Sequence, residues 1–146
     1  MSSPLKNRLQ NDLNEARKGR EKLRTLVLST TLSELRNREI ELGKEAEDSD
    51  VLTVITKAVK RRKEAAAQMR SGGRNELAEK EVTEAEMLSA FLPEGLSEEE
   101  VRRVVQEIVG EGLREMGPVM GQLMPRLKGR FDGKEANRIV REVLAE

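Results

Sequence analysis

The sequence predicts an all-α protein built from an N-terminal four-helix module, residues 1–93, and a small three-helix C-terminal module, residues 94–146. Two observations favour this fold class. Apolar residues recur at spacings of three and four along each periodic segment, with no convincing alternation of period two. Gly or Pro interrupts this pattern at 71–73 and 93–95, where helices are expected to end. We place the module boundary at the second interruption.

The first two helices are expected within residues 4–43. Ser3, which precedes a proline, is typical of a helix N-cap, and the apolar spacing then continues to Gly19. A second, longer helix is expected from there to residue 43. Glu34 is expected to support its exposed face by pairing with Arg38 one turn later.

The third and fourth helices complete the first module. Ser49 is the expected cap of the third helix, which should end at 71–73. The fourth should cover 74–92 and end at Pro93. Its expected buried residues are Leu77, Val82, Ala85, Leu88, Phe91 and Leu92.

The second module is expected to hold three helices. A capping box at 97–100 begins the fifth helix, whose β-branched residues follow a helical spacing of three and four rather than strand alternation. The sixth begins around Gly117 and contains Pro125, which must kink or interrupt it. The seventh begins at Asp132, where Glu135 is expected to complete a second capping box. The sixth helix should bury Val119, Met120, Leu123, Met124 and Leu127.

Composition excludes many kinds of chemistry. The chain has no Cys and no His, so it lacks disulfides, thiol nucleophiles and the commonest general base and metal ligand. Its apolar runs are far shorter than the roughly 18 residues of a membrane span, and its N-terminus does not resemble a secretory signal. These features predict a cytoplasmic, non-enzymatic protein with no catalytic residue, cofactor, metal or membrane contact.

Three features that could carry chemistry have simpler structural interpretations. The acidic run 98–100 suits the first turn of a helix. The Ser-Gly-Gly-Arg run at 71–74 follows a helix and not a strand, which favours a helix stop over a phosphate-binding loop. Met116, Met120 and Met124 repeat every four residues and are expected in the core, although such a face can also bind a peptide.

Charge is segregated along the chain. Lys plus Arg and Asp plus Glu number 27 each, so any polyanion must be bound by a local patch. Residues 6–24, 57–74 and 126–141 are mainly basic, whereas 76–100 is mainly acidic. The cluster on the third helix is a secondary binding candidate, although a solvated, salt-bridged face is the simpler interpretation. Its members cannot all share one helix face, so some must snorkel or pair with the acidic fourth helix. The cluster comprises Lys57, Lys60, Arg61 and Lys63.

The principal RNA-binding candidates surround the last turn between helices. Lys134 and Arg138 are four apart and should share one face near the start of the final helix, where free N–H groups also favour phosphate. Asp132 counts against this interpretation, because its carboxylate could already occupy the helix start. The candidate set is Arg126, Lys128, Gly129, Arg130, Lys134 and Arg138.

Several segments resemble the YqeY-like family. They are the run from Met116 to Lys134, the Phe-Leu-Pro at 91–93 with the capping segment 96–100, and the basic stretch 60–64. The C-terminal module of that family is similar to the tail domain of the B subunit of the tRNA-dependent amidotransferase, which amidates mischarged Glu-tRNA or Asp-tRNA. The resemblance implies tRNA contact by this module. It includes none of the glutaminase or ATP-dependent kinase parts, and 131–133 departs from the amidotransferase version.

The leading functional hypothesis is a non-catalytic module that contacts tRNA or another structured RNA through phosphates, linked to aminoacyl-tRNA amidation. The alternative is a protein–protein adaptor that uses the Met-containing sixth helix or the acidic fourth helix to bind a protein partner. A carbon–nitrogen ligase with glutamine as amido donor is a distant third, because it would rest on resemblance to a non-catalytic tail.

Overall fold

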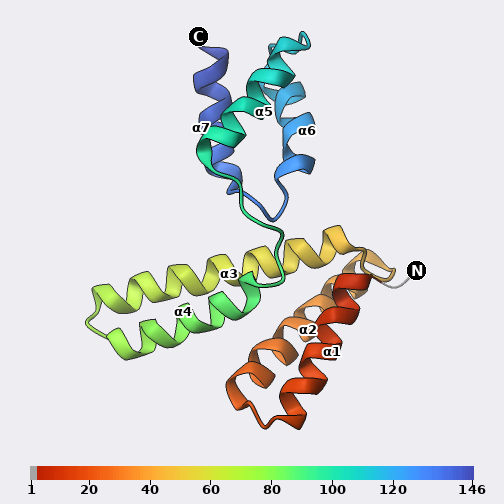
Figure 1. Ribbon diagram of the computed structural model, residues 1–146, viewed down its shortest axis with the longest axis vertical. Coiled ribbons are helices and arrows are strands. Elements are labelled where there is room, and N and C mark those ends of the chain that lie inside the picture. The colour runs from red at the N-terminus through yellow and green to blue at the C-terminus, as the bar shows by residue number, and fades with distance from the viewer. Residues whose placement is uncertain (1–2) are drawn as a thin grey trace. The chain divides into compact units, whose positions relative to one another are not determined.

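The structure is a computed structural model that describes residues 3–146, and within that range it contains seven α-helices and no strand. The all-helical prediction is confirmed, with four helices followed by three (Figure 1). By internal contacts the chain divides into two compact units, Met1–Leu92 and Pro93–Glu146. Within the described part of the chain, none of the helices is long and apolar enough to cross a membrane.

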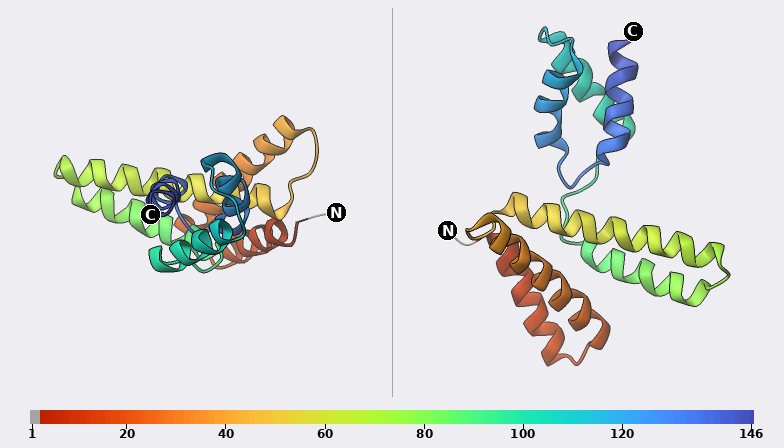
Figure 2. Two further views of the ribbon diagram at one scale, coloured as in Figure 1. Left: turned by 90° about the horizontal axis from the view of Figure 1, so that it is seen from above. Right: turned by 180° about the vertical axis from the view of Figure 1, so that it is seen from behind.

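The N-terminal unit consists of two helical hairpins. Helices α1 (Pro4–Lys18) and α2 (Lys22–Leu42) lie side by side, as do α3 (Asp48–Ser71) and α4 (Asn75–Ser89) (Figures 1 and 2). Apolar stripes from all four helices meet in one core. Its largest fully buried side chains are Leu9, Val27, Leu28, Leu35, Val51, Ile55 and Leu88.

The expected cap of α1 is confirmed, whereas the expected cap of α3 is wrong. Ser3 Oγ accepts a hydrogen bond from the Lys6 N–H at 3.1 Å. Helix α3 begins two residues earlier than Ser49 predicts, because Glu47 and Asp50 form a capping box. In this box the Glu47 N–H donates to Asp50 Oδ2 at 2.9 Å, and Ser49 lies inside the first turn.

Two further expectations for this unit are wrong. Leu77 is 48% exposed, because α4 turns Ala78 toward α3 in place of its neighbour. The expected pairing of Glu34 with Arg38 is replaced by other pairs: Glu34 accepts from Arg61 of α3 at 2.7 Å, and Arg38 lies 3.4 Å from Glu41. Contact between helices that are distant in sequence therefore redirects a pair that helical spacing alone favours.

The C-terminal unit packs α5 (Glu98–Gly110), α6 (Met116–Leu127) and α7 (Gly133–Leu144) around a second core. Ser97 caps α5 as expected, accepting from the Glu100 N–H at 3.1 Å. Helix α6 continues through Pro125 to its last turn. The fully buried side chains of this core include Val101, Val105, Ile108, Val119, Leu123, Leu127, Ile139 and Val140.

The expected burial of Met124 is wrong. Its side chain is 37% exposed, while Met120 is half-buried against the core. Val119, Leu123 and Leu127 follow a spacing of four and occupy the inner face of α6, and the residues that directly follow Val119 and Leu123 lie at the edge of this face. At this edge Met120 is half-buried and Met124 is exposed.

Candidate nucleic-acid interface

The basic turn between α6 and α7 has a defined backbone. Gly129 has a φ of 74°, in the left-handed region where a side chain is strained. The N–H groups of Arg130 and Phe131 both donate to the carbonyl oxygen of Leu127, at 2.7 and 3.2 Å. The chain thus reverses just after α6 ends.

The segment that precedes α5 holds this turn in place. The Leu96 N–H donates to the carbonyl oxygen of Arg130 at 2.9 Å, and Arg130 Nε donates to the carbonyl oxygen of Glu94 at 3.0 Å. Part of the Arg130 guanidinium is therefore used within the fold, although the side chain is exposed. Arg130 fixes the turn and can still present its terminal N–H groups outward.

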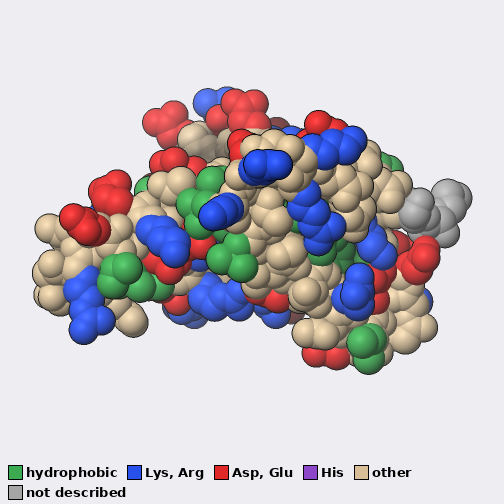
Figure 3. Space-filling view, turned by 90° about the horizontal axis from the view of Figure 1, so that it is seen from below, with side chains coloured by type: hydrophobic (Ala, Val, Ile, Leu, Met, Phe, Trp, Pro, Cys, Tyr) green, Lys and Arg blue, Asp and Glu red, His purple; other side chains and the backbone are tan. Residues whose placement is uncertain are grey.

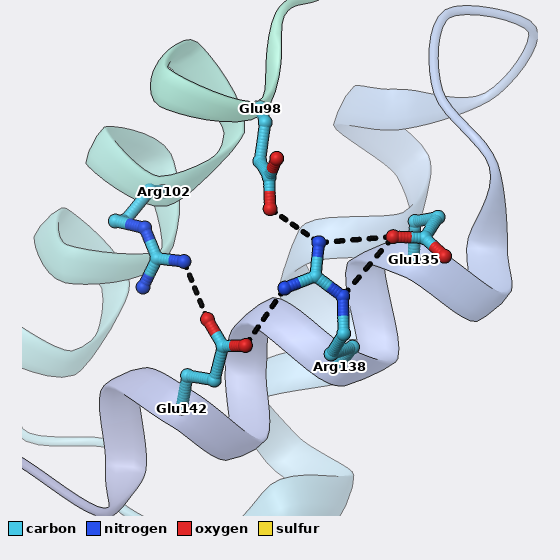
Figure 4. A network of polar contacts seen from close by, with 5 residues as sticks. All are labelled: Glu98, Arg102, Glu135, Arg138 and Glu142. Atoms are coloured by element: carbon cyan, nitrogen blue, oxygen red, sulfur yellow. Dashed lines mark hydrogen bonds and ion pairs between the residues drawn. The ribbon is translucent and has the colours of Figure 1, made fainter.

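Arg138 is engaged by carboxylates on two helices (Figure 4). It pairs with Glu98 of α5, with Glu135 at 2.9 Å and with Glu142 at 2.7 Å. Glu142 also accepts from Arg102 of α5. Hydrogen bonds to Glu98, Glu135 and Glu142 raise the pKa of Arg138 above its usual range. The five side chains hold three carboxylates and two guanidiniums, so the network is net acidic by one charge.

This network was not predicted from the sequence, in which Arg138 is grouped with the basic turn. Glu98 and Arg102 are four apart on α5, and Arg138 and Glu142 are four apart on α7. Each spacing places its pair on one exposed helix face, which is the available signal. The contact between α5 and α7 then joins the two pairs.

The expected second capping box is wrong. Asp132 is the N-cap of α7, but its side chain makes no cap hydrogen bond to the described residues. Glu135 accepts instead from Arg138, which approaches through Nε at 3.1 Å. Two donors of the Arg138 guanidinium converge on Glu135 Oε2, and these charge-assisted hydrogen bonds replace the reciprocal cap. The first backbone N–H groups of α7 are thus left without this side-chain partner.

The remaining basic candidates are exposed. Arg126 lies in the last turn of α6, Lys128 is its C-cap, and Lys134 lies in the first turn of α7. Among the described residues these three side chains form no salt bridge. The turn thus gathers three cations that form no salt bridge, together with Arg130, the Gly129 backbone and the exposed carboxylate of Asp132, while Arg138 is neutralised.

Among the described residues, the secondary basic cluster on α3 forms no salt bridge with α4, although pairing with α4 is one of the two arrangements expected for it. Arg61 forms its salt bridge with Glu34 of α2. Lys57, Lys60 and Lys63 are exposed. The structure therefore leaves these three lysines along the exposed part of α3.

Comparison with known proteins places this architecture in a family. The family model described as Yqey-like protein matches residues 6–144. Altered inheritance of mitochondria protein 41 of Pyrenophora tritici-repentis is 28% identical over 143 residues, which cover 94% of this chain and 79% of that protein. The E subunit of the glutamyl-tRNA(Gln) amidotransferase is 47% identical over 60 residues in Aeropyrum pernix and 41% identical over 59 residues in Thermococcus gammatolerans.

The two similarities differ in extent. The matches to the amidotransferase subunits cover 35% of this chain and only 9% of each subunit. The family model, in contrast, extends over nearly the whole chain, across both helical units. This protein therefore belongs to the YqeY-like protein family.

Proposed function

We propose that this protein is a non-catalytic binding module whose C-terminal unit contacts the phosphates of tRNA or another structured RNA, in connection with aminoacyl-tRNA amidation. The observation that carries the proposal is the α6–α7 turn, where Arg126, Lys128 and Lys134 are exposed without a carboxylate partner among the described residues. Similarity to subunits of an amidotransferase named for glutamyl-tRNA(Gln) supports tRNA as the RNA.

The chemistry of the turn favours phosphates over bases. Lys and Arg donors and backbone N–H groups bind phosphate oxygens and position a protein without reading sequence. Phe131 is the nearest aromatic side chain, and it packs half-buried against the core of its unit. A single half-buried ring is a poor platform for stacking successive bases. Binding is therefore expected to be weak, steeply dependent on salt and tolerant of RNA sequence.

The amidotransferase reaction itself is not proposed for this chain. The chain spans 9% of the matched subunits, and it has neither Cys nor His to serve as nucleophile or base. A carbon–nitrogen ligase activity therefore remains the distant alternative. It predicts turnover of glutamine or ATP that scales with protein concentration and survives repurification.

One observation favours the adaptor alternative. Met124 is 37% exposed on α6, and its methyl carbon lies 3.4 Å from where a Cβ at Gly133 would stand. A flexible, apolar Met side chain of this kind suits contact with a protein partner. A partner retained by the wild-type chain and lost by Met124→Glu, with no RNA in the complex, would support the adaptor.

The test of the RNA proposal compares salt titrations of tRNA binding. We expect Lys128→Ala with Lys134→Ala to weaken binding and to lower the slope of log affinity against log salt by about one unit or less for each lost contact. The control replaces Lys60 and Lys63 on α3 by Ala. If the control alone loses binding, the site lies on α3; if the wild type fails to bind at low salt, the adaptor is favoured.

A further inference from the structure

The N-terminal unit has a polar groove along the α1–α2 hairpin that lies outside the proposed RNA-binding turn. Gln10 and Arg17 of α1 line it together with Ser29, Ser33 and Arg36 of α2, and its volume is about 290 Å³. Residues seven apart lie on the same side of a helix, which explains why each helix contributes one row of polar side chains. The groove presents two guanidiniums, two hydroxyls and an amide.

The side chains that line this groove include two cations and no carboxylate. Arg17 and Arg36 form no salt bridge among the described residues, and the groove is lined by no Asp or Glu. Arg36 also lines a neighbouring hollow that contains both cations and carboxylates, namely Lys6, Lys44, Glu39 and Glu45, and it attracts the Glu39 carboxylate. An anion in the groove would meet two guanidiniums, neither of which has to leave a salt bridge.

The cationic surface continues toward the turn between the two helices. Arg17 and Ser29 also line an adjoining hollow of about 490 Å³, where they are joined by Arg20 and Lys22. No carboxylate lines this second hollow either. Figure 3 shows the face seen from below Figure 1, where Lys and Arg side chains lie across the surface with Asp and Glu side chains among them.

Arg20 occupies a backbone conformation that disfavours it. Its φ is 56°, and it is the only residue other than glycine with a positive φ in the described chain. The hydrogen bonds from Arg20 N–H to Arg17 O, at 3.2 Å, and from Glu21 N–H to Ala16 O, at 3.0 Å, form a helix-ending motif that glycine usually completes. Strained residues of this kind concentrate at functional sites, and here the strained residue is one whose side chain lines the adjoining hollow.

From these observations we infer that the α1–α2 groove is a second phosphate-binding surface, which takes the backbone of an RNA strand. Arginine forks bind phosphate oxygens bidentately, and the Ser33 hydroxyl can supply a further donor. The Ser29 hydroxyl already donates to the carbonyl oxygen of Leu26, and the Gln10 amide donates to Asn14. Four cations arranged from Arg36 to Lys22 along adjoining open hollows suit successive phosphates of a strand better than a single enclosed anion. The identity of the ligand as RNA rests on the proposed function, whereas the phosphate chemistry rests on the groove.

The test uses the full chain and a transcribed tRNA, with affinity measured at several salt concentrations. The groove variant is Arg17→Gln with Arg36→Gln. Its matched control is Arg74→Gln with Arg103→Gln, two exposed arginines with no salt bridge among the described residues. The third arm is the α6–α7 turn variant, in which two lysines become Ala. We expect the groove variant to lose about tenfold in affinity and up to roughly two units of salt slope, and the control to lose far less.

The outcomes separate this inference from the proposed function. Loss in the groove variant alone supports the groove and overturns the turn as the RNA site. Loss in the turn variant alone, or equal loss in the groove variant and its control, overturns the groove. Failure of the wild type to bind tRNA at low salt overturns the RNA inference together with the proposed function.

Two further measurements address the source of the phosphate and the strain at Arg20. In NMR spectra, the amide resonances of Ser29 and Ser33 should shift when tRNA is added. Shifts with sodium pyrophosphate and none with tRNA would assign the groove to a small phosphate compound and overturn the inference.

Arg20→Gly should raise the melting temperature by about 2–5 °C while weakening tRNA binding. Unchanged tRNA affinity in this more stable variant would show that Arg20 does not contact the RNA and would count against the groove.

Discussion

Nζ of Lys6 on α1 lies 2.9 Å from Oε2 of Glu39 on α2, and the Glu39 side chain is 16% exposed. The same carboxylate oxygen accepts a hydrogen bond from the N–H of Ala46 at 2.8 Å. Glu39 thus ties α1 and α2 to the loop that leads into α3. The Ala46 hydrogen bond, followed by the Lys6 hydrogen bond, lowers the pKa of Glu39.

This arrangement predicts an acid-sensitive contribution to stability. Because the folded-state pKa of Glu39 lies below its unfolded value of about 4.5, its contribution is complete above that value and is lost as pH falls through the folded-state pKa. Glu39→Gln should reduce the free energy of unfolding at pH 7 by about 1–3 kcal/mol. Denaturant titrations at pH 7 and pH 3 measure this, and an equal loss at both values would contradict it.

Glu84 on α4 predicts the opposite pH dependence. It is 9% exposed, and burial, with the nearby charge of Glu81, raises its pKa, while Arg62 and Lys80 act to lower it. Ionised Glu84 therefore costs stability, a cost that is absent below the unfolded pKa and complete above the folded one. Glu84→Gln should stabilise the chain at pH 7 and lose that advantage below pH 4.5. Thermal unfolding across pH 4–8 tests this, and destabilisation at pH 7 would refute it.

Replacement of a glycine by Ala is predicted to change the stability of the C-terminal unit in opposite directions at Gly129 and at Gly121. Gly129→Ala should cost about 1–2 kcal/mol, because its φ of 74° strains any side chain. Gly121 lies inside α6 with nothing within 4 Å of an added Cβ, so Gly121→Ala should stabilise by about 0.5–1 kcal/mol. Chemical unfolding of both variants is the measurement. Stabilisation by Gly129→Ala would show that the turn has another backbone conformation in solution.

The salt bridges of Arg138 predict that residues of the basic cluster differ in their effect on tRNA binding. Its guanidinium already binds Glu98, Glu135 and Glu142, so Arg138→Gln should leave the affinity for tRNA and its salt slope almost unchanged. Lys128→Ala, which removes an exposed cation of the turn, should lower that slope by about one unit or less. Both variants are compared with the wild type in the same salt titration. A larger loss from Arg138→Gln would mean that RNA displaces the carboxylates.

Local rules predict much of this fold because its helices carry their own start and stop signals. Ser3 and Ser97 cap helices as their sequence positions indicate, and Gly43 ends α2 with a φ of 69°. Failures occur where two signals compete locally. Ser49 is a good cap by residue type, but Glu47 with Asp50 offers a reciprocal pair, and α3 begins there instead.

In the candidate site, sequence position places some residues and helix packing decides the state of others. Sequence position alone places Lys128 and Gly129 in the turn between two helices, because the periodic segments end on either side of them. The packing of α5 against α7 decides that Arg138 is neutralised, since Glu98 is 40 residues away along the chain.

The sequence by itself determined the helical fold class, the helix order and the local concentration of cations, because these depend on periodicity and on residues within a few positions of one another. Only the tertiary structure decided which charges remain free. Arg61 is paired by α2 and Arg138 by α5, whereas Arg17 and Arg36 line a groove without carboxylates. The physical reason is that the Arg61–Glu34 and Arg138–Glu98 pairs and the groove require side chains from separate helices to meet, and helix packing brings them together.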